Sequence, residues 1–144
     1  MSNVNVDQLF LKAKKSLQNN KVNDAKESYQ KILKNFPKNI RAQDGLNNIN
    51  KVFLASTEKN ILNNYNQGYF KEVVNLTDKL TKSYPNYFMF WKILGLANLN
   101  LNNLKNAEIA LKKAYSLKSE DISILVTLSL ICSNQNNWLE SISF

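Results

Sequence analysis

Apolar residues recur along this chain at the three- and four-residue spacing of amphipathic helices. One such stripe, at i, i+4, i+7 and i+11, consists of Ala42, Leu46, Ile49 and Phe53. Alternating apolar and polar positions, which would indicate strands, do not occur, and glycine and proline are too scarce for the many tight turns of an all-β chain. The pattern predicts an all-α protein with helices near residues 6–19, 22–36, 39–52, 57–66, 69–83, 87–100, 103–117, 121–133 and 136–144.

Residues that suit a left-handed turn stand between paired helices. Glycine adopts this conformation freely and asparagine tolerates it, and the expected turns hold Asn20, Gly68, Asn102 and Asn136. An apolar residue follows each turn by two positions and a smaller residue follows by five, where two helices should cross closely. These residues are Val22, Phe70, Leu104 and Trp138, and then Ala25, Val73, Ala107 and Ser141. Proline ends the second helix at Pro37 and Pro85, and Ser119 replaces it in the third copy.

The turns at Gly68, Asn102 and Asn136 are evenly spaced, with a period of about 34 residues. The step from Asn20 to Gly68 is longer, and the extra residues between the first two copies should form one inserted helix at about 40–53. Ser56 or Thr57 would then cap the helix that follows.

The third copy has the most specific residues. They lie in FMFWKILGLANLNLNNLKNAEIALKKAYSLKSE and are Trp91, Leu94, Gly95, Ala107 and Ala114, at the spacing of the tetratricopeptide pattern. In these positions the chain resembles the tetratricopeptide repeat (TPR) family, although the usual Tyr three residues after the Gly is missing. The resemblance implies an α-solenoid of about four stacked helix-turn-helix repeats in a single domain, at about 6–39, 54–87, 88–121 and 122–144, the last one truncated.

Basic residues outnumber acidic ones and give the chain a net charge of +8. Only Arg41 among the 19 basic residues is Arg, whereas nucleic-acid recognition usually draws on the bidentate Arg fork and on stacking aromatic residues. We therefore interpret the lysines as a solvated surface and expect no nucleic-acid partner. The first repeat is the most basic part and could steer an acidic protein partner.

Residue types that carry catalysis or bind metals are sparse. The chain has no His, which excludes a Ser-His-Asp or Cys-His arrangement and a histidine metal site. Cys132 lies on an apolar helix stripe and is expected to be buried and inert. Glu120 and Asp121 should favour the N-terminus of the following helix through its dipole. The sequence predicts a protein that is not an enzyme and binds no cofactor.

Several absences bear on the compartment. A single cysteine allows no internal disulfide and fits a reducing compartment. The apolar run Ile122–Cys132 is shorter than the roughly 20 residues of a membrane span, and Met1–Phe10 does not have the pattern of a signal peptide. The abundance of Lys, Asn and Ile suggests an AT-rich bacterial genome. We expect a bacterial, cytoplasmic protein with no membrane contact.

The resemblance also implies where a partner would bind. In the TPR family the first helix of each repeat lines a concave groove that usually holds the ligand peptide. Carried over by position, the groove candidates are Phe10, Lys14, Leu17, Glu58, Leu62, Tyr65, Asn66, Lys92, Leu96, Leu99, Asn100, Val126, Leu130 and Asn134. Such a mixed groove suits a partner segment with apolar anchors.

Two features of the groove candidates bear on how a partner segment would be bound. Asn66, Asn100 and Asn134 share one repeat position and could hydrogen-bond a peptide backbone, although the favoured interpretation is that they help to end their helices. Family members that grip a free carboxylate use Lys and Asn on successive turns of the first helix. Phe10 and Lys14 stand there in the first copy, so no such clamp is expected.

The end of the chain suggests an alternative. The last expected helix carries apolar residues that no following helix would cover, namely Trp138, Leu139, Ile142 and Phe144. We expect that the chain continues, or that a partner or a second copy covers this end. Residues 60–103 also resemble the N-terminal repeat region of bacterial proteins that join TPRs to a sulfotransferase-like domain. That resemblance implies the alternative of an arm that presents substrate to an enzyme, and the uncovered C-terminal end would let this arm self-associate.

Overall fold

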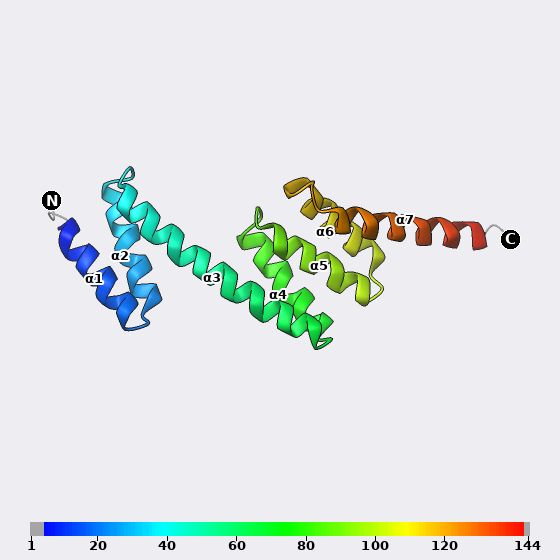
Figure 1. Cartoon of the computed structure of the whole chain (residues 1–144), viewed down its shortest axis with the longest axis horizontal. Helices are drawn as coiled ribbons and strands as arrows, with labels where there is room; N and C mark the ends of the chain where they lie inside the picture. The colour runs from blue at the N-terminus through cyan, green and yellow to red at the C-terminus, as the bar shows by residue number, and fades with distance from the viewer. Residues whose placement is uncertain (1–4, 143–144) are drawn as a thin grey trace. The chain divides into compact units, whose positions relative to one another are not determined.

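The computed structural model describes the backbone of residues 5–142 and the side chains as far as Gln135. These residues form α1 (Val6–Gln18), α2 (Val22–Asn35), α3 (Ile40–Asn66), α4 (Phe70–Ser83), α5 (Phe88–Asn100), α6 (Leu104–Leu117) and α7 (Ile122–Ile142), with no strand among them (Figure 1). The predicted all-α class is confirmed. The chain divides into two compact units, residues 1–56 and 57–144, and each is described by itself.

Three of the predicted left-handed turns are confirmed. Asn20, Gly68 and Asn102 have φ angles of 56°, 83° and 60°. At each turn the backbone N–H donates to the carbonyl three residues back, and the next N–H donates to the carbonyl five residues back. This pair of bonds satisfies the last carbonyls of the helix and ends it, which requires a residue that accepts positive φ.

The residues expected at the helix crossings are buried as predicted. Ala25, Val73 and Ala107 lie near the starts of α2, α4 and α6 and are all 0% exposed. Their small size lets the second helix of each pair approach the first. Gly95 gives a second close approach, because a Cβ atom placed there would lie 2.5 Å from Leu111 Cγ.

The loops after α2 and α4 have the same structure. Pro37 and Pro85 follow these helices, and each proline carbonyl accepts a hydrogen bond from the side chain six residues later. Gln43 Nε2 donates to Pro37 at 2.7 Å, and Trp91 Nε1 donates to Pro85 at 2.8 Å. α3 and α5 therefore begin in the same way.

One predicted helix boundary is wrong in the middle of the chain. The segment 40–53 is helical as expected, but it continues without a break into the next predicted helix and forms the 27-residue α3. Residues 46–66 contain no Gly or Pro, and Leu54 and Ala55 favour helix. Ser56 does not cap a new helix, since its hydroxyl donates to the carbonyl of Phe53 within α3 at 3.0 Å.

A second predicted boundary is wrong near the end of the chain. The expected turn at Asn136 does not form, and α7 continues through it to Ile142 in a stretch without Gly or Pro. The predicted roles of Trp138, Ser141 and the apolar end including Leu139, Ile142 and Phe144 concern side chains outside the described part. The repeat boundaries themselves stay a prediction.

The cores lie between consecutive helices of each unit. In residues 5–56, α3 packs on α1 and α2 through two clusters, one of Phe10, Ile32 and Ala42 and one of Ala13, Ala25 and Ile49. In residues 57–135 a further cluster joins α6 to α7 and consists of Ala107, Leu111, Ala114, Ile124 and Ile131. None of the described helices has the length and apolar character that a membrane span requires.

Candidate functional site

The predicted groove residues of the second unit lie on the second half of α3, on α5 and on α7. Direct contacts show that these helices are neighbours. Tyr87, just before α5, donates from Oη to Glu58 Oε2 on α3 at 2.6 Å. Lys92 Nζ on α5 donates to Asp121 Oδ2, just before α7, at 2.7 Å. These two contacts join α3 to the start of α5, and α5 to the start of α7.

The two contacts use the same pair of repeat positions. The step from Glu58 to Lys92 equals the step from Tyr87 to Asp121, and both equal the step between the turns at Gly68 and Asn102. One interface is closed by a hydrogen bond and the next by an ion pair. Glu58 and Lys92, two of the groove candidates, therefore stabilise the stacking of repeats. Sequence reasoning missed their partners because these are 29 residues away, although the recurrence of that spacing was a usable signal.

Both contacts perturb proton binding. Burial raises the pKa of Tyr87 to about 12, and its hydrogen bond to Glu58 adds to the effect. Lys92, together with the hydroxyl and backbone N–H of Ser123, lowers the pKa of Asp121 to about 2. Asp121 Oδ1 accepts from the backbone N–H of Ser123 at 3.1 Å and so caps the start of α7, while the predicted dipole effect of Glu120 and Asp121 stays a prediction.

A third contact involves the asparagine position. Asn100 Nδ2 donates to Tyr65 Oη on α3 at 2.8 Å and to the carbonyl of Leu96, one turn earlier, at 2.9 Å. The second bond satisfies a carbonyl at the end of α5, which agrees with the interpretation that this residue helps to end its helix. Asn66 and Asn134 share its exposure to solvent.

The apolar groove candidates of this unit differ in exposure. Leu62, Leu96 and Leu99 are half-buried, and Leu99 packs against the α6–α7 cluster. On α7, Val126 is 55% exposed and Leu130 is 60% exposed. The exposed apolar surface of these first helices therefore lies mainly on α7.

The groove candidates of the first unit also differ in their exposure to solvent. Phe10 is only 8% exposed, and its ring packs against Tyr29 while the Arg41 guanidinium lies 4.1 Å from its centroid. It belongs to the core of its unit. Lys14 and Leu17 are exposed on α1.

Cys132 is exposed, so the prediction of a buried thiol is wrong. The residue beside it, Ile131, faces α6 and is 1% exposed. Because successive helical residues are about 100° apart around the axis, Cys132 points away from that core. Among the described residues no cluster of three or more His, Cys, Asp or Glu side chains could hold a metal ion.

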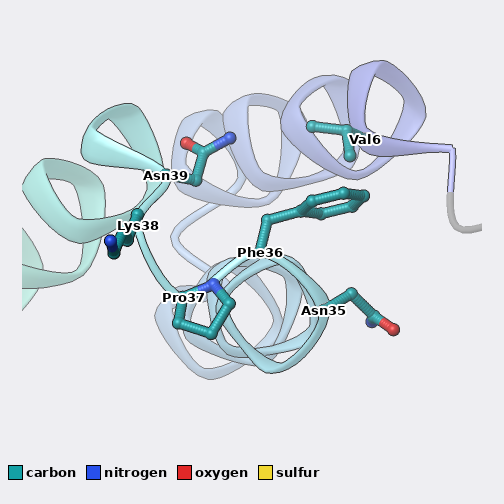
Figure 2. Close-up of a pocket in the computed structure, with 6 residues that line it drawn as sticks. All are labelled: Val6, Asn35, Phe36, Pro37, Lys38 and Asn39. Carbon is teal, nitrogen blue, oxygen red and sulfur yellow. The ribbon is translucent and has the colours of Figure 1, made fainter.

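One hollow in the surface of the first unit has a volume of about 650 Å³. It lies between the start of α1 and the loop after α2, and Figure 2 shows the Phe36 ring facing Val6 there. Asn39 lies at its edge, but its side-chain oxygen accepts from the N–H of Ala42 and so caps the start of α3.

Another hollow of the same unit, which we call the Tyr29 pocket, has a volume of about 500 Å³. It lies between the end of α1, the start of α2 and the middle of α3. The apolar and aromatic residues among those that line it are Leu17, Val22, Tyr29, Ile49, Val52 and Phe53.

A solved structure is similar in fold. The C-terminal TPR-containing domain of a putative FK506-binding protein from Plasmodium falciparum matches with a TM-score of 0.53, over 94% of this chain and 91% of that domain, at 20% identity. The chain has the TPR fold. The first TPR of Spaghetti, solved with an HSP90 peptide, gives a TM-score of 0.48 at 14% identity over 91% of this chain and 95% of that one. No protein-family model and no curated protein matches the sequence.

In the repeat register predicted from the sequence, α1, α5 and α7 would be first helices of repeats and α2, α4 and α6 would be second helices. α3 has two roles, since its start packs as a first helix on α1 and α2 and its end pairs with α4 across the turn at Gly68. In that predicted register all the groove candidates lie on first helices.

Proposed function

We propose that this TPR chain is a protein-interaction scaffold that binds a partner segment along the first helices of its second unit. The observation that carries the proposal is the exposed apolar surface of α7, where Val126 and Leu130 are more than half exposed. Both belong to the set that the TPR resemblance assigns to the groove. Exposed apolar patches of this kind commonly mark protein-binding surfaces.

The neighbouring helix adds polar groups to this surface. Leu96 and Asn100 lie on α5, next to α7. Asn134 lies on α7, at the same repeat position as Asn100. Apolar side chains would anchor the partner, and amide groups would bond to its backbone. Lys92 contributes no free charge, since it is paired with Asp121. The net positive charge of the chain supports an acidic partner.

The proposal is tested by capture of partners from the source cell with the chain as bait. Val126→Ser together with Leu130→Ser should abolish retention of the partners that the unaltered chain retains. Ile109→Ser is the matched control, because Ile109 is 58% exposed on the second helix α6. Equal capture by the α7 variant and the unaltered chain would remove this surface from consideration.

Truncating Tyr65 is a poorer test. Its ring packs edge-on against Phe70 with centroids 5.2 Å apart and its hydroxyl accepts from Asn100, so its loss would also disturb the fold. The alternative of a self-associating arm of a sulfotransferase-like enzyme stays a prediction, which sedimentation of the chain over a range of concentrations would test.

A further inference from the structure

The Tyr29 pocket corresponds to a place in the second unit that aromatic side chains fill. Equivalent positions of the two units differ by the same number of residues. Asn20 is equivalent to Gly68, Ala25 to Val73 and Pro37 to Pro85. Phe36 is likewise equivalent to Tyr84, and their backbone N–H groups each donate to the carbonyl four residues back at 2.7 Å. Positions in one unit can therefore be compared with positions in the other.

At the corner between the helix pair and the next first helix, the second unit has Tyr65 and Phe70. Their rings form an edge-to-face pair with centroids 5.2 Å apart, and the Tyr65 hydroxyl accepts a hydrogen bond from Asn100. The first unit has Leu17 and Val22 at the equivalent positions, so both rings are missing. The side chains left behind are exposed, Leu17 to 39% and Val22 to 44%.

The walls of the pocket suit an apolar ring. Val52, which takes the place of Asn100, is 69% exposed at the mouth. Tyr29 forms the floor, where its ring lies so close to Gly45 that a Cβ atom there would be 2.5 Å from the ring. A volume of about 500 Å³ accommodates one aromatic side chain, and an aromatic guest could pack against the Tyr29 ring as aromatic pairs do.

The charge around the pocket selects among possible guests. Residues 1–56 carry ten Lys and Arg side chains against Asp7, Asp24, Glu27 and Asp44. Exposed Lys21 and Lys51 adjoin the lining residues Val22 and Val52 in sequence, and Asp24 and Asp44 likewise adjoin Asn23 and Gly45. The excess of positive charge therefore belongs to the unit as a whole. This excess favours an acidic segment and disfavours a second copy of the chain, whose own net charge is +8.

We propose that the Tyr29 pocket binds an aromatic side chain carried by an acidic segment of a partner protein. The guest ring restores the packing that Tyr65 and Phe70 provide in the second unit, and the excess of basic side chains in residues 1–56 attracts the carboxylates that flank it. This site lies in the first unit and does not depend on the α7 surface of the proposed function.

The test uses the full chain and three synthetic peptides. The first is a short acidic peptide with one central Trp, the second has Ala in place of that Trp, and the third has Lys in place of the acidic residues. Binding is followed by the NMR shifts of the methyl groups of Val22 and Val52. The Trp acidic peptide should shift both methyl groups and bind about tenfold or more tightly than the Ala peptide, as expected for burying an aromatic side chain. The Lys peptide should not bind.

Val22→Phe puts into the pocket the ring that Phe70 supplies in the second unit, and it should weaken binding of the Trp peptide about tenfold. Leu11→Phe is its control, because Leu11 is 67% exposed on α1 and does not line the pocket. Circular dichroism establishes that both variants keep their helices.

Four results would overturn the proposal: no binding of the Trp peptide at low salt, equal binding of the Ala peptide, unchanged binding by Val22→Phe, or a dimer of the free chain that Val22→Phe dissociates. The last result would make a second copy the occupant. The Val126→Ser and Leu130→Ser variant should bind the Trp peptide like the unaltered chain, so failure of this proposal and failure of the proposed function are distinguishable.

Discussion

Lys92 Nζ lies 2.7 Å from Asp121 Oδ2 and joins α5 to the start of α7. The two side chains are only 21% and 16% exposed, so this ion pair is better shielded from water than the i,i+4 pairs on the helix surfaces. The preceding interface replaces the ion pair with the hydrogen bond from Tyr87 to Glu58. The two interfaces should therefore respond to opposite extremes of pH.

The interface between α5 and α7 should be sensitive to acid. Lys92 lowers the pKa of Asp121 from its ordinary 3.8 to about 2, so the pair contributes its full stability above pH 4 and loses it as the pH falls towards 2. Lys92→Met should lower the free energy of unfolding at neutral pH by about 1 to 2 kcal/mol, between the values for exposed and buried pairs. Urea unfolding of both proteins at several pH values measures the difference, which should shrink towards pH 2. Lys105→Met, on exposed α6 surface, is the control.

The interface between α3 and α5 should be sensitive to alkali. The pKa of Tyr87 is raised from its ordinary 10.0 to about 12, so the folded state keeps a proton that the unfolded chain loses first. Its contribution is complete below pH 10 and declines as the pH rises towards 12. Tyr87→Phe should cost about 1 kcal/mol at neutral pH and make the alkaline loss of stability less steep.

The measurement for Tyr87 is the ultraviolet absorbance of tyrosinate during an alkaline titration. The last transition of the native protein should disappear in Tyr87→Phe and persist in Tyr69→Phe, whose ring is 52% exposed. If the last transition persists in Tyr87→Phe as well, the pKa of Tyr87 is not raised to about 12 in solution.

The close approach at Gly95 should not tolerate a methyl group. A Cβ atom would lie 2.5 Å from Leu111 Cγ and 3.3 Å from the backbone oxygen of Ala107. Gly95→Ala should therefore lower the free energy of unfolding by about 1 to 3 kcal/mol, the usual cost of overpacking, despite the higher helix propensity of alanine. Thermal unfolding followed by circular dichroism measures the effect, and a smaller cost of Gly95→Ala in a Leu111→Ala background than in the unaltered chain would attribute it to this contact.

The sequence predicted those features that local conformation dictates. Asn20, Gly68 and Asn102 mark turns because each must adopt positive φ, and the small residues such as Ala107 mark crossings because a larger side chain would separate the helices. The same local reasoning failed at Asn136, where asparagine permits a turn but does not force one. Whether a helix turns there or continues depends on what packs against it.

The sequence predicted which helices carry the groove candidates, but not what the side chains of these residues contact. Phe10 is on the predicted first helix, yet the Tyr29 ring and the Arg41 guanidinium enclose it. Glu58 and Lys92 are likewise on the predicted face but serve the interfaces between repeats. A repeat pattern specifies which helix carries a residue, whereas its neighbours on other helices decide whether it remains free to bind.

A final prediction concerns the positive φ angle of Asn102, the residue at the turn between α5 and α6. Its φ of 60° is one that alanine adopts only at a cost, whereas glycine adopts it freely. Asn102→Ala should lower the free energy of unfolding by about 1 kcal/mol, and Asn102→Gly should leave it nearly unchanged or raise it slightly, as measured by urea unfolding. Equal stability of the Ala and Gly variants would show that the turn is not left-handed in solution. Lys105→Ala, at an exposed position in the following helix, controls for the general effect of adding alanine near this turn.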